Sequence, residues 1–309
     1  MGDPTVILLR LAQFATAAIL MGSSLFVVYG LPREPLGPAR VLGARPLVML
    51  GSLGLAVAAA AGMLAQTAVL AGSYSEAVKP ASLQAVIGTM AFGKAALVRV
   101  ACGLAAAMLL LTVRSPKLGT WIAVGVLGTV ATASFAWSGH GATSDGTGFW
   151  IHLISDVLHA WAAAAWIGAL FVFALLLRDG SQTPDELARS HHALSRFSTA
   201  GTAFVITLLA TGLINSWYLV GLDHAWSLVT NRYGQLLSLK VAAFAGMLAL
   251  AAANRFKLTP RLHEHLSATT QHPPSLRELR RSIAVETLLG LTALALVSWF
   301  GTLEPPIVA

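Results

Sequence analysis

The chain has 309 residues, of which 56% are hydrophobic and only 11% are Asp, Glu, Lys or Arg. Soluble globular domains average about 25% charged residues, so this composition excludes an ordinary soluble domain and favours a membrane protein. The formal net charge of +7 comes from Lys and Arg in the connections between apolar runs, a placement that reports membrane topology rather than a nucleic-acid partner.

Eight apolar runs are long enough to span a bilayer as helices, which takes roughly 20 residues. They are unbroken stretches of Ala, Leu and Val, unlike the alternating segments of about 10 residues in a membrane β-barrel. The first run is too long for a signal-peptide core and has no basic region before it, so we interpret it as a retained span. We predict an all-α, polytopic membrane helix bundle, a single integral membrane domain over 1–309. The predicted spans cover about 5–31, 47–72, 95–113, 119–137, 151–177, 198–221, 235–253 and 282–303.

Basic residues concentrate in every second connection. Cytoplasmic loops of membrane proteins carry an excess of Lys and Arg, so this alternation indicates which connections face the cytoplasm. It predicts that both termini lie outside, on the periplasmic side. The basic connections are 32–46, 114–118, 178–197 and 254–281.

Two segments of the chain resemble each other. TMAFGKAALVR at 89–99 and TNRYGQLLSLK at 230–240 share Thr, an aromatic residue before Gly, and a cation six residues after that Gly. IAVGVLG at 122–128 similarly parallels IAVETLLG at 283–290. Either the chain contains two repeats in parallel orientation, as some transporters do, or the similarity is chance among Ala- and Leu-rich helices.

The repeat hypothesis predicts two four-helix halves, 1–145 and 146–309. In this register Gln13 matches His159, and Glu286 is matched by a glycine. We therefore predict that the first half is scaffold-like and that the second half, which holds more ionisable groups, carries the function.

The segment IHLISDVLHAW opens the fifth predicted span with three ionisable residues. At about 100° per residue, His152, Asp156 and His159 fall within an arc of about 60° on one helix face. Ionisable residues at membrane depth usually face a bundle interior and mark an ion or proton path. The alternative is structural, with His152 at the wet outer interface and Asp156 hydrogen-bonded to His159.

The spacing of the two histidines limits how they bind a metal. His152 and His159 are about 10 Å apart along the helix axis, whereas a metal–imidazole bond is about 2 Å. One ion therefore does not bridge both without distortion, and the spacing favours a ladder of transient sites. Imidazole and carboxylate ligands suit copper, zinc or nickel, while thioether ligands favour Cu(I).

Further candidate ligands lie outside this stripe. His140 ends the fourth span in the Gly- and Ser-rich loop SGHGATSDGTGFW and is a metal candidate or a solvated loop residue. Met63 and Met90 are candidates for a secondary metal path on the outer side, although methionines in apolar helices are mostly packing residues. Glu286 begins the last span and is either an exit-side ligand or proton acceptor, or an interface residue.

Two cations occupy matching positions of the repeat. Arg99 and Lys240 either pair with buried anions such as Asp156 or Glu286, or extend to the outer interface. The chain lacks a phosphate-binding loop, a dinucleotide fingerprint and a GxSxG nucleophile elbow, so we expect no enzymatic activity.

Three segments together resemble the bacterial copper-resistance D (CopD/PcoD) family. The family signature of a His, an Asp-x-x-His and a Trp-x-Gly is similar to HLISDVLHAWAAAAWIGAL. Its later segment with Tyr-Gly, Lys, Asn-Arg and Pro is similar to RYGQLLSLKVAAFAGMLALAAANRFKLTPRL. Its following segment with Arg-Ser and Glu is similar to RRSIAVETLLG. The resemblance covers about 150–300 closely and the first half more loosely.

This resemblance implies a multi-pass protein of the bacterial inner membrane that acts in copper homeostasis and resistance. It implies copper, as Cu(I) or Cu(II), and a separate periplasmic copper carrier of the CopC type as donor. We expect copper import past His140, His152, Asp156 and His159 towards Glu286. The alternatives are a haem-binding membrane electron-transfer subunit, or a copper-binding sensor or assembly protein without transport.

Overall fold

The computed structural model describes residues 2–31, 43–113, 115–138, 148–177, 184–221, 223–224, 226–260 and 274–306. Within these ranges the chain forms helices and no β-strand. Eight helices are long and apolar enough to cross a membrane, and they follow the eight predicted runs in chain order. The predicted polytopic, all-α bundle is confirmed.

Seven of the eight spans either are uninterrupted by another helix type or end with a short 3-10 or π turn, and the first span contains a π turn within it. In chain order, the spans are α1 (Pro4–Ala18) with the π turn η1 (Ile19–Ser23) and α2 (Ser24–Tyr29), then α3 (Ala44–Ala71), α6 (Ala91–Thr112), α7 (Leu118–Ala133) with the 3-10 turn η3 (Ser134–Ser138), α8 (Gly148–Leu176), α9 (Pro184–Leu219), α11 (Arg232–Ala253) with the π turn η5 (Asn254–Leu258), and α13 (Pro274–Phe300). Three short helices, α4 (Tyr74–Ala77), α5 (Pro80–Thr89) and α10 (Ser227–Thr230), precede the third and seventh spans.

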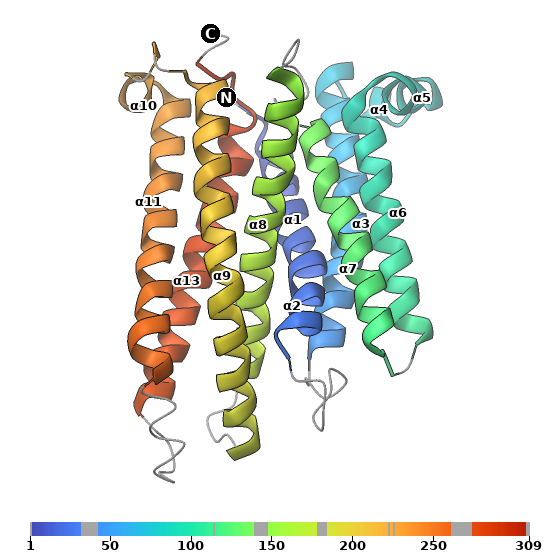
Figure 1. Ribbon diagram of the computed structural model, residues 1–309. Helices are drawn as coiled ribbons and strands as arrows, with labels where there is room; N and C mark the ends of the chain where they lie inside the picture. Colours follow the sequence, from blue (N-terminus) through green and yellow to red (C-terminus); the bar gives the residue numbers. More distant parts are fainter. Residues whose placement is uncertain are drawn as a thin grey trace.

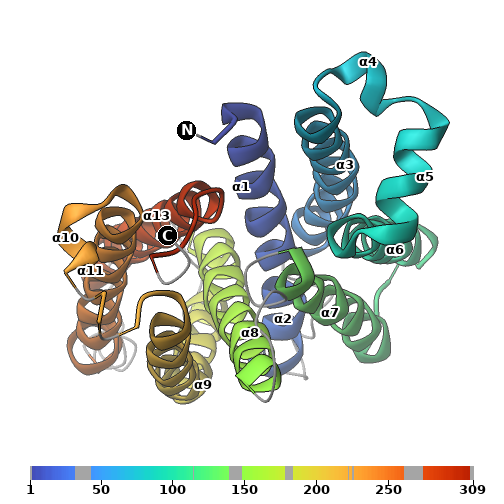
Figure 2. The ribbon, with the colours of Figure 1, turned by 90° about the horizontal axis from the view of Figure 1, so that it is seen from above.

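Two helices, α1 and α8, occupy the centre of the bundle (Figure 2). Helices α3, α6 and α7 lie on one side of this pair, and α9, α11 and α13 lie on the other. Both termini and the short helices α4, α5 and α10 lie at the same end of the bundle (Figure 1). That this end faces the periplasm stays a prediction from the basic connections.

The outward faces of the spans are strongly apolar. Large side chains on several spans are more than 60% exposed, which a soluble monomer rarely tolerates over a contiguous surface. A lipid environment solvates such side chains at no cost, so this surface agrees with the predicted membrane location. Examples are Val57 at 69%, Met108 at 62%, Leu213 at 74% and Leu288 at 63%.

The two central helices cross through a pair of glycines. A Cβ atom on Gly22 would overlap the carbonyl oxygen of Ala164, and a Cβ atom on Gly168 would overlap the carbonyl oxygen of Ala18. The hydroxyl of Ser23, in the π turn, donates to the Gly168 carbonyl at 2.9 Å. Small residues allow this close backbone approach in membrane bundles. Gly22 and Gly168 also occupy matching positions in the predicted repeat, although the division into halves 1–145 and 146–309 stays a prediction.

The other pair of matched glycines, Gly93 and Gly234, has a shared local role. Each lies in the first turn of its span, where an added Cβ atom would overlap the carbonyl oxygen of the preceding short helix, at Val86 or Ser227. The Asn231 side chain caps α11 by accepting from the Gly234 N–H at 2.8 Å. The aromatic-Gly motif therefore marks where a short helix folds back onto the start of a span.

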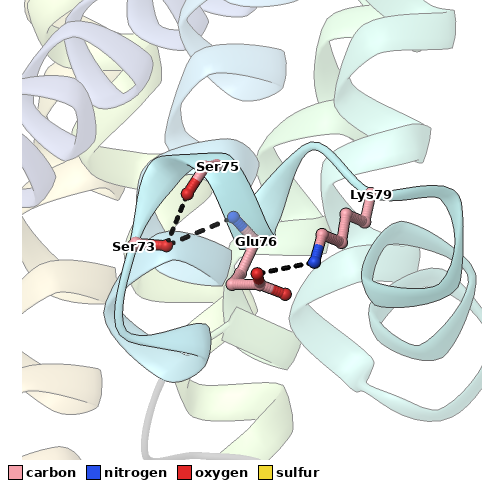
Figure 3. Close-up of polar contacts among 4 residues, drawn as sticks. All are labelled: Ser73, Ser75, Glu76 and Lys79. Carbon is pink, nitrogen blue, oxygen red and sulfur yellow. Dashed lines mark hydrogen bonds and ion pairs between the residues drawn. The ribbon is translucent and has the colours of Figure 1, made fainter.

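The α4–α5 connection is polar and exposed. Ser73 caps α4 by accepting from the Glu76 N–H at 3.2 Å, and Lys79 forms an ion pair with Glu76 at 2.6 Å (Figure 3). Both charged side chains are about half exposed, so the pair contributes little to the free energy of folding. These groups are typical of a segment in water, at the end of the bundle that also holds the termini.

Candidate functional site

The polar stripe predicted on α8 faces α9, which runs antiparallel to it (Figure 1). Every member of the stripe contacts one α9 side chain. The α9 residues are spaced i, i+4 and i+7, as are the α8 residues. Because the helices are antiparallel, the first residue of the set on α8 contacts the last residue of the set on α9. The pairs are His152 with Tyr218, Asp156 with Asn215, and His159 with Thr211.

The hydrogen bonds of Thr211 determine which nitrogen of His159 carries a proton. The Thr211 hydroxyl donates its single hydrogen to the Thr207 carbonyl at 2.5 Å. The same oxygen lies 3.0 Å from His159 Nδ1, so in that contact it accepts and Nδ1–H donates. The Nε2 lone pair of His159 is then available to a ligand. Metal-binding histidines commonly donate their second nitrogen to an acceptor in this way.

Asp156 accepts a hydrogen bond from an amide and lies near a cation that does not form an ion pair with it. Asn215 Nδ2 donates to Asp156 Oδ1 at 2.8 Å. Lys240, on α11, is close enough for its positive charge to act on both Asp156 and His159, but it makes no ion pair within 4.0 Å in the described part of the chain. The carboxylate thus has one oxygen bound by a neutral donor and a cation nearby.

His152 is buried at the end of α8 that lies with the termini. Only 1% of its surface is exposed, and its ring stacks on Tyr218 with centroids 4.8 Å apart and planes 5° apart. The sequence also allowed a solvated interfacial histidine at this position. Burial against Tyr218 instead places His152 inside the α8–α9 contact.

Glu286, on α13, forms a second buried polar cluster with Trp166 of α8 and Asn254. Trp166 Nε1 donates to its Oε1 at 2.7 Å, and Asn254 Nδ2 donates to its Oε2 at 3.0 Å. Glu286 is 1% exposed, so it is a core residue and not an interface residue. Trp166 follows His159 by seven residues, a rise of about 10 Å, which equals the step from His152 to His159.

Comparisons with known proteins agree over the whole chain. The family model described as copper resistance protein D-like, N-terminal domain, matches residues 1–150, and the model described as copper resistance protein D matches residues 191–300. The chain is 33% identical over 308 residues to copper resistance protein D of Pseudomonas syringae pv. tomato, covering 99% of this chain and 98% of that protein. The chain belongs to the copper resistance protein D family.

A second relative supports the cellular location. The chain is 28% identical over 308 residues to inner membrane protein YebZ of Escherichia coli strain K12, covering 97% of this chain and 98% of that protein. No solved structure matches. Together with the eight apolar spans, the relatives identify a copper-related, multi-pass protein of the bacterial inner membrane.

The remaining predicted site residues of this copper resistance protein D family member are dispersed. Met63 lines a cavity in the first half, and Met90, the residue before α6, is not among the residues that line it. Arg99 donates to Ser138 Oγ at 3.1 Å and lies over the Phe135 ring. His140 falls outside the described residues.

Within the described ranges, no three His, Cys, Asp or Glu side chains converge on one point. The α8–α9 contact therefore supplies separated imidazole and carboxylate positions rather than a closed cage. Thr211, Asn215 and Tyr218 were not predicted, nor was the role of Asn254. The repeated i, i+4, i+7 spacing of polar residues in consecutive spans was the available signal for the α9 residues.

Proposed function

We propose that this protein imports copper across the inner membrane through the contact between α8 and α9. Copper enters near His152, with His140 as a further ligand, passes to Asp156 and His159, and leaves towards Glu286. Membership of the copper resistance protein D family supports copper as the substrate. The protein acts as a transporter and not as an enzyme.

The observation that carries this proposal is the hydrogen bonding of His159. Its Nδ1–H is bound by Thr211, so Nε2 is available as a copper ligand at the middle of the stripe. His152, His159 and Trp166 follow one another at intervals of seven residues, about 10 Å each. Such intervals suit an ion that is passed between weak sites, because a single strong site would retain it.

A nearby cation and hydrogen-bond donors offset the cost of burying the two carboxylates of the proposed path. A buried carboxylate is costly in a membrane unless a cation or hydrogen-bond donors are near it. Lys240 acts on Asp156 from α11, and a copper ion at Asp156 would take over this balancing role. At the far end, Trp166 and Asn254 hold Glu286 in place through both carboxylate oxygens.

The donor of copper in this proposal is a separate periplasmic carrier of the CopC type. It would approach the end of the bundle that holds the termini, α4, α5 and α10 (Figure 1), where His152 lies near the start of α8. Copper received there enters the stripe at its first histidine.

Copper accumulation in cells tests the role of His159. We expect His159→Ala to lower accumulation, measured by mass spectrometry of washed cells at equal protein expression, to the level of cells without the protein. His192→Ala is the matched control, because His192 also lies on a span helix, α9, but outside the stripe. Equal accumulation by His159→Ala and wild type would remove His159 from the path.

Two measurements separate this proposal from the alternatives. Copper flux into liposomes containing the purified protein is expected; saturable copper binding without flux would instead support a sensor or assembly protein. A Soret band with stoichiometric haem in the purified protein would support the electron-transfer alternative and contradict copper import.

A further inference from the structure

The first half of the bundle contains a cavity of about 150 Å³ that the copper path does not use. It lies between α1, α3, α6 and η3, towards the end of the bundle that holds the termini. Its volume is about ten times the probe-occupied space that one water needs, so it accommodates a small solute with water. Its polar lining consists of Arg10, Gln13, Gln66, Arg99 and Ser138.

Two arginines and, within the described residues, no carboxylate line this cavity. Arg99 is 4% exposed, and its Nε and Nη1 have no hydrogen-bond partner. Arg10 Nε is also buried without a partner. Among the described residues, no Asp or Glu lines the cavity. The ion pair found in the described ranges is the exposed Glu76–Lys79 pair, which is not part of the lining (Figure 3).

The contacts of Arg99, a lining residue of the cavity, leave two of its nitrogens without a hydrogen-bond partner. Its Cζ atom lies over the Phe135 ring, 4.6 Å from the centroid, and its Nη2 donates to Ser138. Guanidinium donors lie in the plane of the group, so stacking on Phe135 does not satisfy them. The free Nε–H and Nη1–H point in different directions within that plane, and each can donate to an oxygen of an anion.

Leaving these groups without a ligand is costly. A buried donor without a partner costs about 1–3 kcal/mol, and more when it is charged. The charges of Arg10 and Arg99 also repel each other across the cavity. An anion between them removes both penalties, whereas a metal cation would increase the repulsion.

The register of the predicted repeat gives an independent argument. Extending the match of Gln13 with His159 by three residues places Arg10 opposite Asp156 in the two halves. The acidic position of the copper path is therefore basic in the first half. The other cation of the cavity, Arg99, matches Lys240, so the cavity has two cations where the copper path has one cation and one carboxylate.

We propose that the cavity between Arg10 and Arg99 binds a small oxyanion of the phosphate or sulfate type. Arg99 donates from its unpartnered Nε–H or Nη1–H, Arg10 supplies the second positive charge, and Gln13 and Gln66 supply neutral polar groups. Free inorganic anions and the phosphate of a lipid headgroup share this chemistry. The site is separate from the copper path and does not depend on the proposed copper import.

Equilibrium dialysis with radioactive sulfate tests the site on delipidated, purified protein in a neutral detergent. We expect about one sulfate bound per chain, and an affinity lowered about tenfold or more by Arg99→Gln, because a charged hydrogen bond is removed. Arg99→Lys retains the charge and should lose less affinity. Arg277→Gln, which removes an exposed arginine on α13, should bind sulfate as wild type does.

Further measurements distinguish the source of the anion and guard against unfolded variants. Native mass spectrometry before delipidation detects an anionic phospholipid; sulfate binding that appears only after lipid removal identifies the headgroup phosphate as the occupant. Where Arg99 variants do not elute as a single species, Arg10→Gln and the cavity-filling Gln66→Trp replace them. Wild-type protein that binds neither sulfate nor anionic lipid, or folded variants that bind like wild type, would overturn the proposal.

Discussion

At the scale of single residues, the hydrogen bonds around His159 assign a different role to each ring nitrogen. Thr211 donates to its own helix and accepts from Nδ1–H, which leaves Nε2 as the only nitrogen with a lone pair. The uncharged hydroxyl of Thr211 thereby determines which ring nitrogen of His159 carries the proton and which one can bind a ligand. The same logic applies to Asp156, where Asn215 binds one oxygen and leaves the other for a cation.

Removing the Thr211 hydroxyl tests this role. We expect Thr211→Val, which keeps the side-chain shape, to raise the copper concentration for half-maximal uptake into liposomes by about 10- to 100-fold, the usual effect of losing such a supporting contact. Thr211→Ser keeps the hydroxyl and should behave like wild type. Thr292→Val, at an exposed threonine of α13, is the control. Unchanged uptake by Thr211→Val would show that the Nδ1 contact does not orient the ligand.

At the scale of helices, the crossing of α1 and α8 positions the whole stripe. Gly168 lies nine residues after His159 on the same helix, and its contact with Gly22 sets how close the two central helices approach. Trp161 Nε1 donates to the Thr129 carbonyl at 2.9 Å, so the opposite face of α8 is tied to α7. With these two contacts, the polar face of α8 is directed at α9.

Adding a methyl group at the crossing tests its importance. Gly168→Ala places a Cβ atom against the backbone of Ala18 and Gly22, and overpacking of this kind costs about 1–3 kcal/mol. We expect a lower melting temperature for the detergent-solubilised variant. Gly88→Ala is the matched control, because nothing lies within 4 Å of the added Cβ atom there. Equal melting temperatures for the two variants would contradict a tight crossing.

At the scale of the whole molecule, both termini lie at one end (Figure 1), and the basic connections predict that this end is periplasmic. The direction of copper movement is defined relative to this orientation. His152 lies near the end that is predicted to be periplasmic, and Glu286, on α13, binds Trp166 further along α8. With that orientation, the order of the stripe corresponds to the proposed import.

Cysteine labelling in intact cells tests the orientation. The single native cysteine, Cys102, is buried and is replaced by alanine as the background. In that background, Glu304→Cys should react with a membrane-impermeant maleimide, because Glu304 is exposed near the C-terminus. Arg277→Cys, exposed on α13 at the opposite end, should react only after the cells are permeabilised. The reverse labelling pattern would invert the topology and the proposed direction of transport.

The sequence by itself determined the class of the protein, the eight spans and the polar face of α8. These properties depend on local hydrophobicity and on the 3.6-residue helical period, so they do not need knowledge of which helices meet. The signature around His152, Asp156, His159 and Trp166, together with the two later segments, was also sufficient to suggest the family. The sequence did not indicate what each of them contacts.

Only the tertiary structure decided the partners, because contacts between distant segments depend on how the helices cross and rotate. It brought Thr211 to His159 and Asn254 to Glu286, and it gave the tryptophan of the signature the function of holding that glutamate. It also directed Arg99 to Ser138, in a cavity that no carboxylate of the described residues lines. The predicted repeat places Arg99 and Lys240 in matching positions. Helix packing, however, placed Arg99 near a second cation, Arg10, and Lys240 near a carboxylate, Asp156.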